Sequence, residues 1–105
     1  MKEISVQELK KLKDEGADFQ LIDVREPYEF DQANLGGELI PLATLLDNVD
    51  KIDKEKQVVV HCRSGKRSAN AIMVLEQKFG YENLHNLTGG ILAYIEEIDD
   101  SIINQ

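Results

Sequence analysis

The sequence has only one cysteine, no tryptophan and just 2 prolines. A single thiol cannot form a disulfide within the chain, which excludes a small domain held together by disulfides. The one cysteine and the 2 histidines also lack the spacing of a zinc site. We therefore expect neither a disulfide framework nor a metal site, and nothing in the sequence requires an organic cofactor.

Long apolar segments are also missing. No stretch approaches the roughly 20 apolar residues that a membrane-spanning helix needs. Residues 1–5 carry one basic side chain, and no apolar segment of the kind found in a secretory signal follows them. These features predict no membrane partner and a cytoplasmic location, where a lone thiol stays reduced.

Basic residues are scarce: 12 lysines and arginines face 20 aspartates and glutamates, which gives a net charge of −8. This balance argues against a nucleic-acid partner bound through its phosphates. The 105 residues, 42% of them hydrophobic, can bury a real core. We expect one domain over residues 1–105 rather than a multi-domain enzyme or a disordered chain.

Short apolar segments alternate with helical patterns along the chain. Ser5 and Glu8 have the spacing of a capping box, and Gly16 lies where that first helix would end. We expect strands over residues 19–24, 38–41, 57–61 and 84–87, and further helices over residues 27–30, 42–49, 68–79 and after Gly90. Such alternation predicts an α/β domain with a largely parallel sheet and helices on both faces.

The strand with three consecutive valines leads into the one concentration of positive charge in the chain. Arg63, Lys66 and Arg67 fall within five residues, directly after Cys62. In parallel α/β sheets, ligands gather where strands end and helices begin. A tight turn at Gly65 would point backbone amides at one spot, and the next helix would add its positive end. Both favour an anion, so we expect Cys62 to be a thiolate nucleophile.

An inert role is the alternative for Cys62, because a lone buried cysteine often acts as a small hydrophobic residue. Three basic neighbours at a strand-to-helix turn weaken this alternative. Positive charge at the start of a helix opposes the helix dipole, so these side chains are not there to stabilise the helix.

At these residues the chain resembles the rhodanese-like sulfurtransferase family. Four blocks occur in the order found in the family and together span nearly the whole chain: LIDVREPYEF at residues 21–30, LIPL at 39–42, the turn at 62–68, and LTGGI at 87–91. The resemblance implies a central five-stranded parallel sheet flanked by helices on both faces.

The resemblance also implies a reaction. Cys62 would take a sulfur atom from a small anionic donor such as thiosulfate, and would pass it as a persulfide to cyanide, a thiol or a protein. Backbone amides of the turn would hold the terminal sulfur, much as an oxyanion hole holds oxygen, and its basic side chains would steer the donor. The implied substrate-binding residues are Arg63, Ser64, Gly65, Lys66, Arg67 and Ser68.

Asp23 and Arg25, at the end of a neighbouring strand, are the expected supporting residues. We interpret Asp23 as a hydrogen-bonded brace for the site rather than a general acid. Arg25 has two interpretations, substrate binding at the mouth of the site or a surface ion pair. His61 is interpreted as structural, because adjacent strand residues point to opposite faces. Residues 32–38 are one residue shorter than the family pattern and lack its histidine.

Two other functions fit the same residues. A cysteine-dependent phosphatase or arsenate reductase has five residues between its cysteine and an arginine that grips the oxyanion, whereas only four separate Cys62 from Arg67. A non-catalytic rhodanese-like module would bind a partner, but such modules typically lose the cysteine. A persulfide carrier would hand its sulfur to a protein. We favour sulfur transfer through Cys62; with no second cysteine in the chain, an outside acceptor must discharge the persulfide.

Overall fold

The computed structural model describes residues 1–104 and has a five-stranded sheet in which every strand pair is parallel. The strand order is β1-β5-β4-β2-β3. The strands are β1 (Lys2–Ile4), β2 (Phe19–Asp23), β3 (Glu38–Leu39), β4 (Gln57–His61) and β5 (Leu84–Leu87). The α-helices are α1 (Val6–Asp14), α2 (Pro27–Gln32), α3 (Lys66–Phe79) and α4 (Gly90–Glu97), and two 3₁₀ helices are η1 (Leu42–Lys51) and η2 (Asp100–Ile102).

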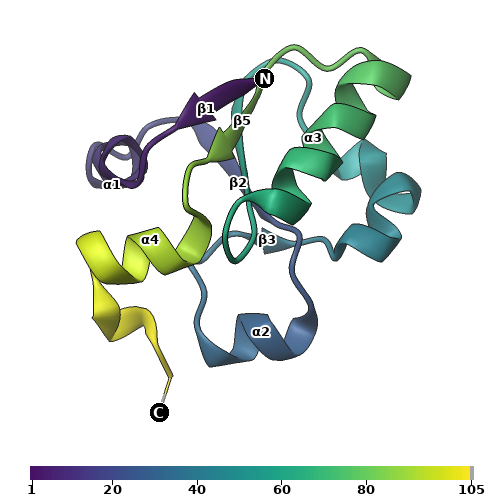
Figure 1. Ribbon diagram of the computed structural model, residues 1–105. Helices are drawn as coiled ribbons and strands as arrows, with labels where there is room; N and C mark the ends of the chain where they lie inside the picture. Colours follow the sequence, from purple (N-terminus) through teal and green to yellow (C-terminus); the bar gives the residue numbers. More distant parts are fainter. Residues whose placement is uncertain (105) are drawn as a thin grey trace.

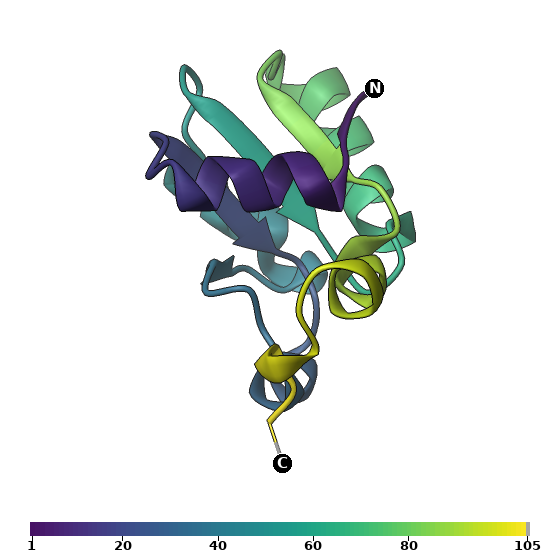
Figure 2. The ribbon, with the colours of Figure 1, turned by 90° about the vertical axis from the view of Figure 1, so that its left-hand side faces the viewer.

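Helices cover both faces of the sheet, which confirms the predicted fold class (Figures 1 and 2). In the central strand β4, Val58 and Val60 pack with the side chains of α3 and η1. Val59 points the other way and packs with α1 and α4. The strand is therefore buried on both faces, which is why it appears in the sequence as an unbroken apolar run.

The start of α3 lies two residues earlier than the predicted helix over residues 68–79. Gly65 has a φ of +106° and turns the chain directly into the helix, a conformation that only glycine adopts without strain. Lys66 and Arg67 therefore belong to the first turn of α3 rather than to a loop. At the other end, Gly80 closes the helix as predicted.

Other boundaries also differ from the prediction. The predicted α-helix over residues 42–49 is the 3₁₀ helix η1, which extends to Lys51 and is interrupted at Asn48. The capping box of Ser5 and Glu8 is confirmed, with both of its hydrogen bonds at 3.1 Å. The edge strand β1 was not expected from the residue pattern, because it has three residues and buries only Ile4.

The C-terminal segment lies across the end of α2 (Figure 2). Ile103 forms an isolated antiparallel bridge with Ala33, and the Asn104 amide donates to the Gln32 carbonyl at 2.7 Å. The C-terminal segment is therefore held against the end of α2. Within residues 1–104, no helix combines the length and the apolar character needed to cross a membrane.

Candidate functional site

Cys62 follows the last residue of β4, at the start of the turn that leads into α3. Its side chain is 1% exposed. The Gly65 amide donates a hydrogen bond to Cys62 Sγ at 3.1 Å, and the Ser68 hydroxyl lies 3.4 Å from the same sulfur. The turn thus wraps hydrogen-bond donors around one sulfur atom.

These contacts set the ionisation of the thiol. Burial alone would raise the pKa of Cys62, because it disfavours the charged thiolate. Hydrogen bonds from the Ser68 hydroxyl and from the amides of Ser68, Gly65 and Ser64 outweigh burial and lower the pKa below its ordinary value. A lowered pKa increases the thiolate fraction near neutral pH, and the thiolate is the reactive form of cysteine.

The first turn of α4 holds the other side of the cysteine turn. The amides of Ile91 and Leu92 donate to the carbonyls of Cys62 and Arg63 at 3.0 and 3.2 Å. Amides in the first turn of a helix have no partner within the helix, so they are free to make these bonds. The carbonyls of the turn are thereby tied to α4, and the amides that follow can face the sulfur.

Gly90 makes this close approach to the turn possible. A Cβ atom at Gly90 would lie 2.6 Å from the Cys62 carbonyl oxygen and would also overlap the Arg63 carbonyl. The glycine has a φ of +61°, a conformation that other residues adopt only with strain. The LTGGI block therefore packs directly against the cysteine turn.

Asn86 on β5 contributes a second connection, which sequence reasoning missed. Its Nδ2 donates to the Gly65 carbonyl at 3.1 Å, and its Oδ1 accepts from the Ser68 hydroxyl at 2.6 Å. Asn86 is 5% exposed and Ser68 is fully buried. One side chain therefore fixes both the glycine that bonds the sulfur and the serine beside it.

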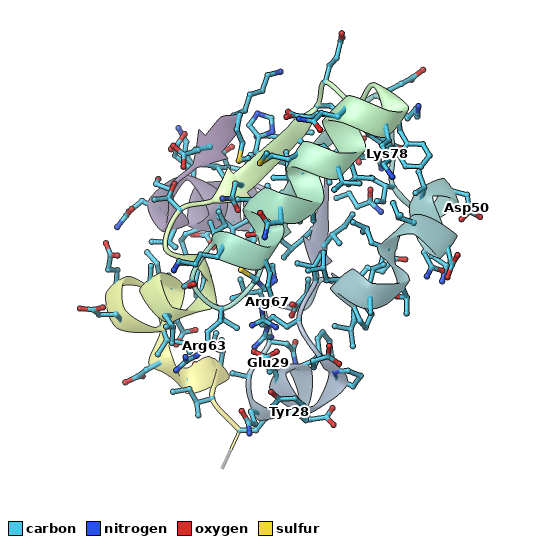
Figure 3. The ribbon with its side chains drawn as sticks, turned by 45° about the vertical axis from the view of Figure 1, so that its right-hand side comes forward. Tyr28, Glu29, Asp50, Arg63, Arg67 and Lys78 are labelled. Carbon is cyan, nitrogen blue, oxygen red and sulfur yellow. The ribbon has the colours of Figure 1, made fainter. Side chains whose placement is uncertain are left out.

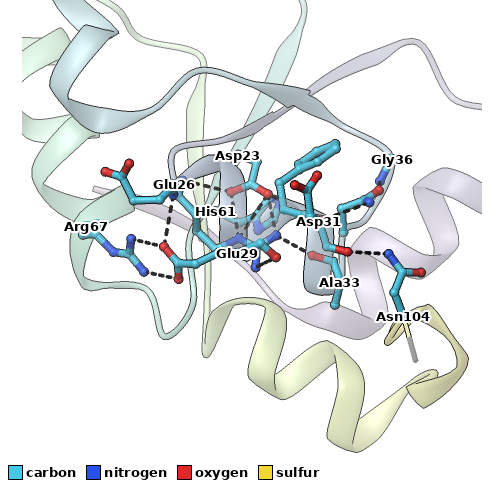
Figure 4. A network of polar contacts seen from close by, with 12 residues as sticks. Asp23, Glu26, Glu29, Asp31, Ala33, Gly36, His61, Arg67 and Asn104 are labelled. Atoms are coloured by element: carbon cyan, nitrogen blue, oxygen red, sulfur yellow. Dashed lines mark hydrogen bonds and ion pairs between the residues drawn. The ribbon is translucent and has the colours of Figure 1, made fainter.

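Sequence reasoning also missed Glu29, which pairs with the arginine at the end of the turn. Glu29 on α2 accepts two hydrogen bonds from the Arg67 guanidinium, at 2.7 and 2.9 Å. Figure 3 shows Arg67 directed toward Glu29, and Figure 4 shows the paired bonds. The guanidinium holds the pKa of Glu29 down, to about 2, so the carboxylate is charged at neutral pH and Arg67 is neutralised by it.

The three basic side chains of the turn are therefore not equivalent. Arg63 and Lys66 are exposed, and neither forms an ion pair with another residue in the described part of the chain. In Figure 3, Arg63 lies on the side of the turn that faces the C-terminal helices. The unpaired positive charge of the turn comes from these two residues.

Asp23 and Arg25 form a buried pair at the carboxyl end of β2. Arg25 Nη2 lies 2.7 Å from Asp23 Oδ2, and Arg25 also donates to the carbonyls of Glu29 and Ala33 at 3.2 and 2.7 Å. Arg25 is 4% exposed, so the interpretation as a surface ion pair is wrong. Instead, the pair connects the end of β2 to the middle and the C-terminal end of α2.

His61 lies against this pair rather than against the sulfur. Its Nε2 is 3.7 Å from Asp23 Oδ2, and the ring is fully buried. Burial lowers the pKa of His61 to about 4, despite the nearby carboxylate of Asp23, so the ring is neutral at pH 7. In residues 1–104, no three His, Cys, Asp or Glu side chains are grouped so that they could hold a metal ion.

Known proteins are similar to this chain in sequence. The family model described as "Rhodanese-like domain" matches residues 5–97. A protein of Allochromatium vinosum named "Sulfurtransferase" is 38% identical over 78 residues, which cover 73% of this chain and 72% of that protein. The "Probable adenylyltransferase/sulfurtransferase MoeZ" of Mycobacterium tuberculosis is 31% identical over 103 residues, which cover 95% of this chain but 26% of that protein.

A solved structure extends the likeness to the fold. The crystal structure of a rhodanese-related protein from Thermoplasma volcanium has a TM-score of 0.82 and 28% identity, and the match covers 93% of this chain and 94% of that one. This chain spans only about a quarter of the length of several curated relatives that it matches, at 26% and 22% of two of them.

Proposed function

This chain belongs to the rhodanese-like domain family, and from that premise we propose that it is a sulfurtransferase that carries sulfur as a persulfide on Cys62. The observation that carries the proposal is the set of hydrogen bonds around Cys62 Sγ, with the Gly65 amide at 3.1 Å and the Ser68 hydroxyl at 3.4 Å. The lone reactive thiol needs a reducing compartment, so the cytoplasm is the location that we propose.

The first step transfers sulfur from the donor to the enzyme. The Cys62 thiolate attacks the outer sulfur of thiosulfate, the bond between that sulfur and the sulfite group breaks, and sulfite leaves with the electron pair. Arg63 and Lys66, which form no ion pair within residues 1–104, attract the anionic donor. Hydrogen-bond donors in the turn then stabilise the negative outer sulfur, as preorganised amides stabilise an oxyanion.

The second step returns the enzyme to its thiolate. A thiophilic acceptor, cyanide or a thiolate, attacks the outer sulfur, and the electron pair of the persulfide bond returns to Cys62 Sγ. The hydrogen bonds that lower the pKa of Cys62 also make its thiolate a better leaving group. The same contacts thus assist both halves of the cycle.

The pairing of Arg67 supports sulfur transfer over phosphate chemistry. A phosphatase of the cysteine type needs the arginine after its loop to grip the phosphate oxygens in a bidentate manner. In this protein Glu29 already takes both of those donors, at 2.7 and 2.9 Å. A phosphate would have to displace a carboxylate whose pKa is held at about 2.

A persulfide carrier with a protein acceptor is the second candidate function. The relative in Mycobacterium tuberculosis carries a name that joins an adenylyltransferase to a sulfurtransferase, and this chain matches 26% of its length. A chain of this kind could hand its sulfur to a protein partner instead of a small molecule. The rate of sulfur transfer to small acceptors, compared with the rate of transfer to a protein thiol, distinguishes the two candidate functions.

The experiment that tests the proposal measures the intact mass of the protein after treatment with thiosulfate. We expect a species one sulfur atom heavier, which cyanide removes and which Cys62→Ser does not form. Asn70→Ser, at an exposed position of α3 outside the cysteine turn, is the control and should still gain the sulfur. Hydrolysis of an aryl phosphate with no gain of sulfur would contradict the proposal and favour the phosphatase.

A further inference from the structure

A cavity of about 230 Å³ opens beside the cysteine turn, between α2, α4 and the C-terminal segment. Leu92 and Ile103 remain 42% and 41% exposed there. Exposed apolar side chains that meet at a cavity mark a binding site for a ligand with an apolar part. The aliphatic wall consists of Ala33, Ile91, Leu92, Ile95 and Ile103.

One uncompensated charge faces this wall. Of the ionisable side chains that line the cavity, Arg25 is paired with Asp23 at 2.7 Å and Glu29 with Arg67 at 2.7 Å. Arg63 has no such partner within residues 1–104. An occupant with one anionic group would therefore find one free cation.

The lining also limits the shape of the occupant. Its residues in the described chain include no aromatic ring, so a nucleotide base or another flat ring would find no stacking partner. The volume of about 230 Å³ lies below the roughly 300–1,000 Å³ of sites for drug-sized ligands. A short aliphatic chain fits these limits.

Two residues of the cavity wall bond the backbone of the cysteine turn. Ile91, in its wall, donates its amide to the Cys62 carbonyl at 3.0 Å, and Leu92 donates to the Arg63 carbonyl at 3.2 Å. Thiosulfate and cyanide have no carbon chain that could use an aliphatic wall. The wall instead suits a second substrate that does have one.

We propose that this cavity binds the sulfur acceptor, a low-molecular-weight aliphatic thiol with an anionic group at its other end. The inference rests on the proposed persulfide chemistry of Cys62. The carbon chain lies against Leu92 and Ile103, and the anionic group pairs with Arg63. A carboxylate can accept two parallel hydrogen bonds from a guanidinium.

The transfer step balances without an oxidant or reductant. The acceptor thiol first loses its proton to solvent, and the negative outer sulfur of the Cys62 persulfide takes up a proton from solvent. Its thiolate attacks the outer sulfur of the protonated Cys62 persulfide, and a new bond between the two sulfurs forms. The bond from the outer sulfur to Cys62 Sγ breaks, and its electron pair stays on Sγ as the thiolate. The product is the persulfide of the acceptor.

The kinetic test compares three thiols as acceptors with the sulfur-loaded protein. We expect kcat/KM for 6-mercaptohexanoate to exceed the values for 3-mercaptopropionate and 6-mercaptohexanol by about fivefold or more. The first comparison removes part of the chain, and the second removes the charge. Equal values for the three thiols would overturn the proposal.

A matched pair of leucine variants locates the effect. Leu92→Ser should lower the ratio of kcat/KM for 6-mercaptohexanoate to kcat/KM for cyanide by about fivefold. Leu46 is 51% exposed on η1, which packs on the opposite face of the sheet, so Leu46→Ser should keep the wild-type ratio. An unchanged ratio in Leu92→Ser, or a peptide such as Gly-Cys-Gly that serves as well as 6-mercaptohexanoate, would contradict the proposal.

A binding measurement separates this proposal from the proposed function. Hexanoate has no thiol and cannot react, so a titration followed by amide NMR reports the cavity alone. We expect shifts at Ile91, Leu92 and Ile95 that 1-hexanol reproduces only weakly. If these amides do not move while the protein still passes sulfur to cyanide, the acceptor cavity fails and the sulfurtransferase stands. If no donor loads Cys62, the acceptor role fails together with the function.

Discussion

The hydroxyl of Ser68 has one proton and two acceptors within reach. Asn86 Oδ1 lies at 2.6 Å from the oxygen, and Cys62 Sγ lies at 3.4 Å. In the thiol form, Ser68 can donate to Asn86 and accept from the S–H group. In the thiolate form, the proton is needed at the sulfur, so Asn86 competes directly with the thiolate for it.

We therefore expect Asn86→Asp to raise the pKa of Cys62. A carboxylate holds the Ser68 proton more strongly than an amide, places negative charge near the thiolate and cannot donate to the Gly65 carbonyl. Alkylation of Cys62 by iodoacetamide at pH 7 should slow by about tenfold, the cost of one charge-assisted hydrogen bond. The full rate profile against pH gives the direction of the shift.

Two further variants show whether the effect passes through Ser68. Asn70→Asp makes the same charge change at an exposed position of α3, and its alkylation profile should match that of the wild type. In a Ser68→Ala background, Asn86→Asp should have a smaller effect, because the shared proton is gone. Equal effects in both backgrounds would show that Asn86 acts through charge alone.

Asn86 and Glu29 also mark the limit of what the sequence could predict at this scale. The sequence placed Cys62 on a strand-to-helix turn because the valine strand, the glycine and the helical pattern are all local signals. Asn86 lies 18 positions from Ser68, and Glu29 lies 38 from Arg67. Neither has a local pattern that distinguishes it from a solvent-exposed polar residue, so only the fold reveals their partners.

At the scale of elements, strand β4 could be predicted from the sequence, whereas strand β1 could not. A central parallel strand buries both faces, so its composition alone identifies it. An edge strand of three residues with one buried side chain has almost no signal of its own, and it becomes ordered by pairing with β5. The parallel sheet could thus be predicted, whereas the extent of its edges depends on tertiary contacts.

The connection between α4 and the cysteine turn is the element contact that matters most for the site. Gly90→Ala should disrupt it, since a Cβ there would lie 2.6 Å from the Cys62 carbonyl oxygen. We expect a loss of roughly 2–4 kcal/mol in the free energy of unfolding, from backbone strain and steric overlap. We also expect slower persulfide formation, because the turn must shift.

Gly16→Ala is the matched control for this prediction. Gly16 has a φ of +63°, close to the +61° of Gly90, but nothing lies within 4 Å of a Cβ built there. It should therefore show the backbone strain of about 1 kcal/mol without any change in alkylation of Cys62. Urea unfolding reports the strain in both variants, and the alkylation rate of Cys62 reports whether the turn is disrupted. Similar alkylation rates in both variants would mean that α4 does not shape the turn.

At the scale of the whole molecule, buried titratable groups make the stability depend on pH. The pKa of His61 is lowered from 6.5 to about 4 in the folded chain. Between these pH values the unfolded chain binds a proton at His61 and the folded chain does not. The contribution of His61 to the free energy of unfolding is therefore fully present above pH 6.5 and decreases as the pH falls toward 4. The loss from this one group is roughly 3 kcal/mol.

His61→Gln should remove that dependence, because the substituted side chain does not titrate. Measured by urea unfolding, its stability should fall less steeply than that of the wild type between pH 6.5 and 4. Glu29→Gln provides the contrast, since the pKa of Glu29 is lowered from 4.5 to about 2 and its contribution disappears in that lower window. Parallel curves for wild type and His61→Gln would contradict the assignment of the upper window.

The net charge of −8 repels an anionic donor at long range, whereas the cysteine turn attracts it at short range. Salt screens charges beyond about 10 Å at 0.1 M, so only cations near the mouth of the site can steer thiosulfate. Lys66 lies in the first turn of α3 and Lys78 in its last turn. Twelve residues of helix separate them by about 18 Å.

Lys66→Ala and Lys78→Ala therefore remove the same charge from the same helix at different distances from Cys62. We expect Lys66→Ala to lower kcat/KM for thiosulfate by about two- to fivefold at low salt, with a smaller loss as salt is added. Lys78→Ala should stay close to the wild type throughout. Equal losses in the two variants would show that the overall charge sets the rate. If neither variant lost activity, Lys66 would have no role in attracting thiosulfate.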